Sequence, residues 1–332
     1  MLKIGYKIGP EQFSPLEMLE QVIAAEKNGF ESIDVSDHFH PWSEEGQACF
    51  TWSWLGAAAA RTETIELGPG VTCPILRYNP AIIAQAAATV SSLAGGRTYL
   101  GVGTGEALNE YPVTYEWPTF RERQAMMIES IQLIRSLWTG EKIDFEGCYY
   151  RTRQAKLYTL PKNEIPIYIS SLAPESAYLA GYYGDGLMTV GEGMDTTKCE
   201  QILSEFKRGA NDAGRDFEEI PKAVELFVDY TGDLEKAVEN FKKYWAGAMV
   251  PALFLNKIYT PAMSAQNGKI IGKDVIQKSV CISDDPEKHI ELIKKYIDIG
   301  FTHLYFHSAS EDQIAFLEGY GKDVLPALKK MG

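Results

Sequence analysis

The feature that most constrains the fold is a repeated unit: an amphipathic helix, a glycine and a short β-branched strand. Leu16, Leu19 and Ile23 lie at helical spacing, and Gly29 ends that helix before a strand at 32–36. The pattern predicts eight strands, at residues 3–7, 33–36, 65–71, 99–102, 167–170, 187–190, 223–230 and 303–306. Helices separate most of them. Eight alternating β and α units predict a closed (β/α)8 TIM barrel rather than an open doubly wound sheet.

Two stretches interrupt this alternation. Residues 140–164 are expected to form a β-hairpin excursion, and residues 245–274 are expected to be long and irregular. Such insertions in a barrel usually cover the active site or build an oligomer interface. No linker separates a second unit, so we expect a single domain over residues 1–332.

Charge and composition disfavour several classes of function. The net charge of −13 works against a nucleic acid or an anionic membrane as a partner. The five cysteines form no Cys-x-x-Cys pair, and no acidic or histidine cluster has metal-ligand spacing, so we expect neither a disulfide framework nor a metal. No apolar run approaches the roughly 20 residues that span a bilayer. Because no secretory signal is visible, we expect a cytoplasmic protein.

Residues that could do chemistry follow the predicted strands at their carboxyl ends, where TIM barrels keep their active sites. Asp37, His38 and Trp42 follow the strand that ends at residue 36. A histidine, with an ordinary pKa of about 6.5, suits the task of accepting a proton from a hydroxyl group. The Trp42 indole N–H suits holding a substrate oxygen. From the residues alone, His38 could instead be structural, and His40 could equally be the catalytic group.

Other strand ends carry further candidates. Glu106 ends the glycine-rich turn that includes Gly105, and its carboxylate is expected to face the barrel axis unless it is merely an exposed acid. Glu11, after the first strand, would also point toward the mouth. Gly70 and Val71 suggest a bulge or a close approach of the backbone to a planar ligand. The segment 170–174 enters a helix and could hold a phosphate or form an ordinary cap.

Three motifs together resemble the bacterial-luciferase-like flavin and deazaflavin barrels: Ser36–Trp42, Arg77–Gln85 and Gly101–Glu110. They match best the branch that uses coenzyme F420, an 8-hydroxy-5-deazaflavin. The resemblance runs from Lys3 to near the C-terminus. It implies a TIM barrel and, as is usual for the family, a homodimer.

The resemblance also implies a role for each candidate. His38 would take the hydroxyl proton while a hydride passes from the carbinol carbon to C5 of F420, Trp42 would hold the developing carbonyl oxygen, and Glu106 would lie by the ring. Glu11, Trp42 and Trp245 would contact the substrate. The bond between Gly70 and Val71 would be cis. Cofactor contacts would come from Asp37, Gly70, Val71, Thr72, Gly105, Ser171, Leu172, Ala173, Thr189 and Val190.

Two kinds of relative within this branch differ in substrate charge. The glucose-6-phosphate dehydrogenases carry a lysine after the sixth strand and an arginine before the last helix, where this chain has Glu192 and Ser279. Its apolar segment 244–254 resembles the lid of the secondary-alcohol dehydrogenase. We therefore expect F420-dependent oxidation of a small secondary alcohol to a ketone. The alternatives are a sugar-6-phosphate dehydrogenase that uses Lys198, Lys269 or Lys278, a flavin-dependent monooxygenase, and a cofactor-carrying barrel without turnover.

Overall fold

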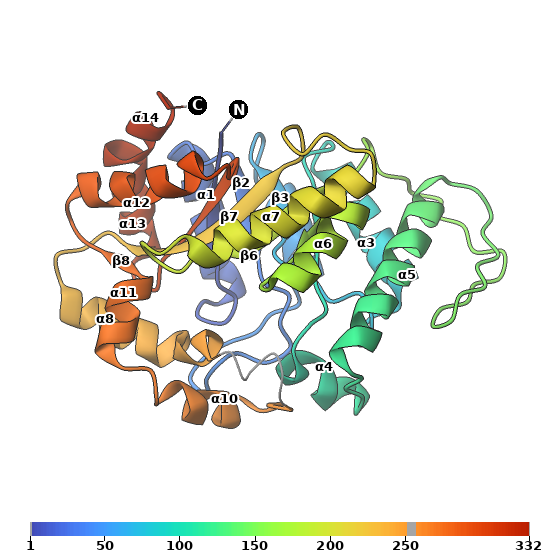
Figure 1. The fold of residues 1–332 in the computed structure, drawn as a ribbon, viewed down its shortest axis with the longest axis horizontal. Helices are drawn as coiled ribbons and strands as arrows, with labels where there is room; N and C mark the ends of the chain where they lie inside the picture. The colour runs from blue at the N-terminus through green and yellow to red at the C-terminus, as the bar shows by residue number, and fades with distance from the viewer. Residues whose placement is uncertain (1, 251–256, 332) are drawn as a thin grey trace.

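The strands of the computed structural model, which describes residues 2–250 and 257–331, close into a barrel (Figure 1). Eight of them run parallel in the order β3-β2-β1-β9-β7-β6-β5-β4, and isolated parallel bridges, Leu67 to Thr98 and Thr72 to Val102, join β3 to β4. A short strand, β8, pairs with the end of β7. The strands are β1 (Lys3–Ile8), β2 (Ser32–Val35), β3 (Glu66–Pro69), β4 (Leu100–Val102), β5 (Ile167–Ser170), β6 (Gly186–Val190), β7 (Lys222–Asp229), β8 (Cys281–Ile282) and β9 (His303–His307). The predicted TIM barrel and its eight strands are confirmed.

Helices surround this barrel, and local signals explain where several of them begin. Ser14 and Glu17 form a capping box at α1, Thr119 and Glu122 form another at α5, and the Asn79 side chain caps α3. The helices are α1 (Pro15–Lys27), α2 (Thr51–Ala59), α3 (Pro80–Leu93), α4 (Ala107–Thr114), α5 (Phe120–Trp138), α6 (Pro174–Tyr183), α7 (Thr197–Asp212), α8 (Leu234–Tyr244), the 3-10 helix η1 (Ala246–Met249), α10 (Pro261–Gly268), α11 (Lys273–Ser279), α12 (Pro286–Asp298), α13 (Gln313–Asp323) and α14 (Leu325–Leu328).

A cluster of tyrosines fills the inside of the barrel. Tyr99 stacks on Tyr168 with ring centroids 5.2 Å apart, and Tyr305 lies beside them. Strand glycines make room for these rings: a Cβ on Gly5 would lie 2.4 Å from a ring carbon of Tyr305, and one on Gly68 would lie 2.6 Å from Tyr99. At this layer the barrel is therefore a packed core and not an open channel.

The first insertion is a hairpin, as predicted. Antiparallel bridges join Ile143 to Ala155 and Glu146 to Arg151, and the segment projects from the side of the molecule beside α5 (Figure 1). Glu129 of α5 anchors it by accepting the backbone N–H groups of residues 148–150. Residues 140–164 are all described, and none of them lines the cavity at the carboxyl ends of the barrel strands.

The prediction that residues 245–274 are irregular was wrong for much of the described part. This part contains η1, α10 and the start of α11. The Thr260 side chain accepts the N–H of Met263 and Pro261 occupies the first turn, which is a helix-start signal that the prediction overlooked. Residues 251–254 of the expected apolar lid (244–254) lie outside the described residues.

Candidate active site

A cavity of about 730 Å³ opens at the carboxyl ends of the barrel strands. Most of the predicted site residues line it: Glu11, Asp37, His38, Trp42, Gly70, Val71, Gly105, Glu106, Leu172, Ala173, Thr189, Val190 and Trp245. Thr72 and Ser171 are buried and are not part of the lining, and their hydroxyl groups bond to the protein itself. Segments far apart in the sequence thus meet at one site.

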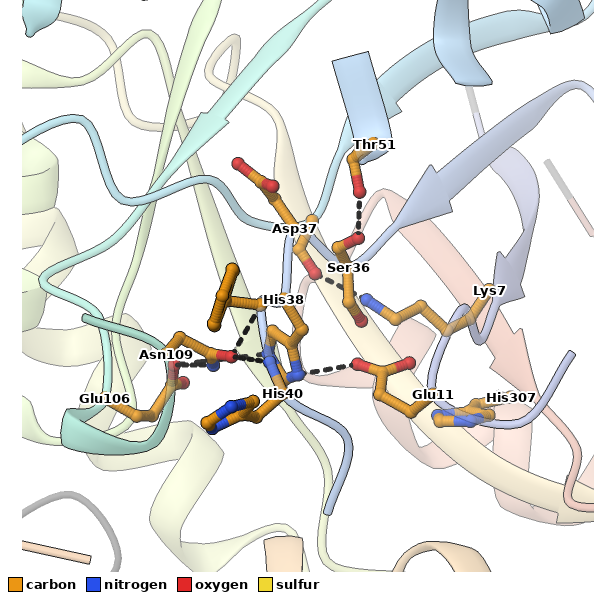
Figure 2. Close-up of polar contacts among 12 residues, drawn as sticks. Lys7, Glu11, Ser36, Asp37, His38, His40, Thr51, Glu106, Asn109 and His307 are labelled. Atoms are coloured by element: carbon orange, nitrogen blue, oxygen red, sulfur yellow. Dashed lines mark hydrogen bonds and ion pairs between the residues drawn. The ribbon is translucent and has the colours of Figure 1, made fainter. Parts of the chain in front are cut away.

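His38 forms a close acid–base pair with Glu11 (Figure 2). The two residues follow β2 and β1, which are adjacent and in register at Ile8 and Val35, so the residues after the strands meet. His38 Nδ1 lies 2.9 Å from Glu11 Oε1, and His38 Nε2 lies 4.0 Å from Glu106 Oε2. This geometry turns Nε2 away from Glu11 and leaves it available to a substrate hydroxyl.

The environment changes the pKa of both partners. Burial alone would lower the pKa of His38, but the Glu11 carboxylate outweighs it and raises the pKa above its usual 6.5. Burial alone would raise the pKa of Glu11, but the charge and hydrogen bond of His38 bring it below its usual value. Glu11 therefore stays ionised and strengthens His38 as a base.

Trp42 and Trp245 are buried walls of the cavity with different hydrogen-bonding states. The Trp42 ring stands edge-on to His38, with centroids 4.8 Å apart. Its Nε1 is buried and has no partner in the described part of the chain, so this N–H can serve a ligand oxygen. Trp245 Nε1 donates to Gln12 Oε1 at 2.9 Å, which makes Trp245 a fixed wall rather than a donor.

Asn109, which the sequence reasoning missed, connects Glu106 with the loop that carries His38. Its Oδ1 accepts the backbone N–H groups of Phe39 and His40 at 2.9 and 3.1 Å, and its Nδ2 donates to Glu106 Oε2 at 3.2 Å (Figure 2). Glu106 is the N-cap residue of α4, so a residue three positions later lies over it on the first turn. That spacing was visible in the motif Gly101–Glu110.

The carboxylate of Asp37 is occupied by protein groups. Thr72 Oγ1 donates to its Oδ2 at 2.5 Å and Tyr78 donates to its Oδ1 at 2.9 Å. Arg77 Nη2 donates to the Asp37 carbonyl oxygen at 2.6 Å. Asp37 thus holds together the loop after β2 and the segment after β3, both of which border the cavity.

Further lining residues, at the ends of β3, β4 and β6, fit a flat ring with polar edges. The peptide bond between Gly70 and Val71 is cis, as the resemblance implied. A Cβ on Gly103 would lie 2.8 Å from Val71 Cγ2, so only glycine leaves this wall smooth. Thr189 Oγ1 is buried without a partner among the described residues, as is Trp42 Nε1. The residues present therefore fit a deazaflavin.

A cluster of buried charges, also missed from the sequence, lies at the floor of the cavity. Lys7 Nζ lies 2.6 Å from Asp34 Oδ1 and 3.7 Å from Glu225 Oε2, and His307 Nδ1 lies 2.5 Å from Glu225 Oε1. Burial raises the pKa of Asp34 to about 7 against the opposing effect of Lys7. Burial would raise the pKa of Glu225, but Lys7 and His307 lower it to about 2. Charged residues inside otherwise apolar strands were the available signal.

The cavity rim carries the positions that distinguish the two substrate classes. Glu192 Oε1 and Lys198 Nζ form an ion pair of 2.8 Å, with side chains 51% and 42% exposed. Both residues and Ser279 line the cavity. Lys269 and Lys278, the other two lysines of the sugar-phosphate alternative, do not line it.

Other features of the described residues concern metals, membranes and thiols. Within residues 2–250 and 257–331, no cluster of histidine, cysteine and acidic residues is suited to a metal ion. In the same ranges, no helix combines the length and apolarity that a membrane crossing requires. All five cysteines are free thiols.

Comparisons with known proteins match the whole chain. The family model described as luciferase-like monooxygenase matches residues 2–303. The F420-dependent glucose-6-phosphate dehydrogenase of Mycolicibacterium gilvum (strain PYR-GCK) is 41% identical, covering 100% of this chain and 99% of the relative. F420-dependent glucose-6-phosphate dehydrogenase 2 of Rhodococcus jostii (strain RHA1) is 42% identical with the same coverage.

A solved structure adds a second kind of relative. An F420-dependent secondary alcohol dehydrogenase in complex with an F420-acetone adduct has a TM-score of 0.93 and 37% identity, covering 98% of this chain and 99% of that one. A coenzyme F420-dependent tetrahydromethanopterin reductase from Methanopyrus kandleri, with a TM-score of 0.81 and 22% identity, shares the fold. The chain therefore belongs to the luciferase-like family and is an F420-dependent oxidoreductase that acts on CH–OH groups.

Proposed function

We propose that His38 accepts the hydroxyl proton of the substrate through Nε2 while its Nδ1 stays bonded to Glu11. The observation that supports this most is the 2.9 Å pair between His38 and buried Glu11. Coenzyme F420, when bound, supplies the hydride acceptor at C5. The Trp42 N–H holds the substrate oxygen, and Glu106 places a carboxylate on the other side of His38, within 4.0 Å.

For the substrate, a sugar 6-phosphate has the stronger support. The curated relatives, which are glucose-6-phosphate dehydrogenases, match the entire chain, so they support this alternative better than the small secondary alcohol that we expected from the sequence. Lys198 offers a cation at the rim. An exposed ion pair contributes only about 0–1 kcal/mol, so a phosphate dianion can replace Glu192 as the partner of Lys198.

The second candidate is an uncharged secondary alcohol, and the charge at the rim favours it. Glu192 repels a dianion, and Ser279 offers a hydroxyl where the glucose-6-phosphate branch has an arginine. The structural relative at 37% identity is a secondary alcohol dehydrogenase. The same acid–base group, His38, would serve either substrate.

One comparison tests both candidates. The loss of the oxidised deazaflavin absorbance is followed with glucose 6-phosphate and with 2-propanol, on the unmodified protein, Lys198→Ala and Glu192→Gln. A sugar-phosphate enzyme prefers glucose 6-phosphate, has a higher KM in Lys198→Ala and a lower one in Glu192→Gln. Preference for 2-propanol, with both variants unchanged, supports the second candidate. Reduction by neither substrate, nor by other alcohols and sugar phosphates, refutes the dehydrogenase mechanism.

We also propose that the chain is one domain and a cytoplasmic homodimer, as the resemblance to the family implies. Light scattering on the purified protein tests the dimer, because a monomeric mass at micromolar concentration contradicts it. A single cooperative unfolding transition is expected for one domain.

A further inference from the structure

Arg123 is a buried cation without an acidic partner. It lies in the first turn of α5 and is 3% exposed, yet no carboxylate lies within 4.0 Å of it in the described ranges. Residues 1, 251–256 and 332 contain no aspartate or glutamate. Buried charges in proteins are normally paired. Lys7, the other buried cation that lines the cavity, follows this rule, because it is paired with Asp34.

The guanidinium of Arg123 is held in a fixed orientation. Its Nε donates to the Thr104 carbonyl oxygen at 3.2 Å, and its Nη1 donates to the Pro118 carbonyl oxygen at 2.6 Å. Its carbon lies 3.6 Å from the centroid of the Trp117 ring. These contacts use Nε, Nη1 and one face of the group. No acceptor for Nη2 is found among the described residues.

Arg123 belongs to the same cavity as His38, and so do the residues at the start of α6. Arg123 lines the cavity together with Thr104, after β4, and with Leu172 and Ala173, after the neighbouring strand β5. The N-terminus of α6 has no side-chain cap, because Ala173 is its N-cap residue and Ser171 donates its hydroxyl to the Ala173 carbonyl. An unpaired guanidinium and an uncapped helix N-terminus that line the same cavity both favour an anion.

We propose that Arg123 binds the phosphodiester of the F420 side chain. The phosphodiester is then the counter-ion that Arg123 lacks within the described protein. The inference rests on the proposed function only in taking F420 as the cofactor. Arg123 holds the tail of the cofactor and does not touch the reacting carbon, so it governs affinity rather than the hydride step.

Three deazaflavins separate the possible sources of the anion. FO carries the chromophore and a ribityl chain but no phosphodiester, F420-0 adds the phosphodiester with its lactyl carboxylate, and F420 adds the glutamates. Their dissociation constants are measured by fluorescence titration on the unmodified protein, on Arg123→Gln and on Arg123→Lys. The matched control is Arg135→Gln, an exposed arginine of the same helix that pairs with Asp185.

In Arg123→Gln, affinity for F420-0 and F420 is expected to fall about 10- to 100-fold, as for one charge-assisted pair, while affinity for FO stays unchanged. Arg123→Lys recovers part of the loss, and Arg135→Gln changes nothing. An equal loss of affinity for all three ligands would show that Arg123 only clamps the loop at Thr104. A loss of affinity for F420 alone would show that Arg123 binds the glutamates and not the phosphodiester. Either result, or no loss at all, overturns the proposal. Circular dichroism checks that each variant is folded.

These outcomes are distinct from failure of the proposed function. The binding measurement needs no substrate, so a protein that binds F420 through Arg123 but oxidises no alcohol or sugar phosphate would retain this inference. A protein that binds none of the three deazaflavins fails as an F420 enzyme altogether.

Discussion

His38 Nδ1 lies 2.9 Å from Glu11 Oε1, and Glu11 is only 1% exposed. A buried carboxylate behind an imidazole fixes its tautomer and stabilises its protonated form. The two residues come from separate strands, so the pair exists only because β1 and β2 are neighbours. Several expectations about rate and stability follow from this relationship and from the groups around it.

Replacing His38 is expected to remove the base without removing the cofactor site. In His38→Asn, kcat should fall about 10²- to 10⁴-fold, the usual contribution of a general base, while deazaflavin affinity measured by fluorescence changes little. His40→Asn is the matched control, because His40 lies in the same loop but does not line the cavity. If His40→Asn loses more activity than His38→Asn, the assignment of the base is reversed.

The pH dependence of oxidation should report the pKa of His38. Only the neutral imidazole accepts a proton, so kcat/KM rises with pH through a midpoint above the ordinary 6.5, because Glu11 raises the pKa. In Glu11→Gln the raising charge is absent, so the midpoint moves to lower pH and the plateau falls because the base is weaker. Rate profiles from pH 5 to 9 measure both effects. If the midpoint does not move in Glu11→Gln, the rise of kcat/KM with pH reports the titration of another group and not of His38.

Asn109 should affect both activity and stability. Asn109→Ala leaves the N–H groups of Phe39 and His40 without their acceptor, and each of these part-buried hydrogen bonds contributes about 0.5–1.5 kcal/mol. Thermal unfolding and kcat should therefore fall together. Asn109→Asp keeps the acceptor but places a second carboxylate beside Glu106, so it should recover stability more than activity. Equal recovery of both would mean that the contact with Glu106 has no catalytic role.

Lys7 should be essential for stability. In Lys7→Met the carboxylates of Asp34 and Glu225 lose their cation, and the free energy of unfolding should fall by about 3–5 kcal/mol. Urea unfolding followed by tryptophan fluorescence measures this change. The double variant Lys7→Met with Asp34→Asn removes one of the uncompensated carboxylates and should regain part of the loss. A loss below about 1 kcal/mol in the single variant contradicts the pairing.

Most of the barrel was predictable because its signals are local. Helices that end at glycine, β-branched strands and capping pairs such as Thr119 with Glu122 depend on residues a few positions apart, and the structure contains them. The prediction for residues 245–274 was wrong because Thr260 and Pro261 were not recognised as the start of a helix. The extra strand β8 has two residues, too few for any periodicity to detect.

The candidate site was predictable only where strand ends and family motifs carried it. His38, Trp42 and Glu106 do lie on one cavity. Asn109 and Arg123 were missed because their significance lies in partners distant in the sequence: the loop at residues 39–40 for one and Thr104 for the other. A sequence pattern shows which residues share an element, but not which atoms remain unpaired.

The amino-acid sequence by itself determined the alternation of strands and helices, the placement of His38 and Glu106 at strand ends and the family, since these depend on local periodicity and contiguous motifs. Only the tertiary structure decided that Glu11 stands behind His38, that Asp37 accepts hydrogen bonds from Thr72 and Tyr78, and that Arg123 has no carboxylate partner in the described part of the chain. The physical reason is that hydrogen bonding and charge pairing act over a few ångströms in space, and closure of the barrel sets which distant residues come within that range.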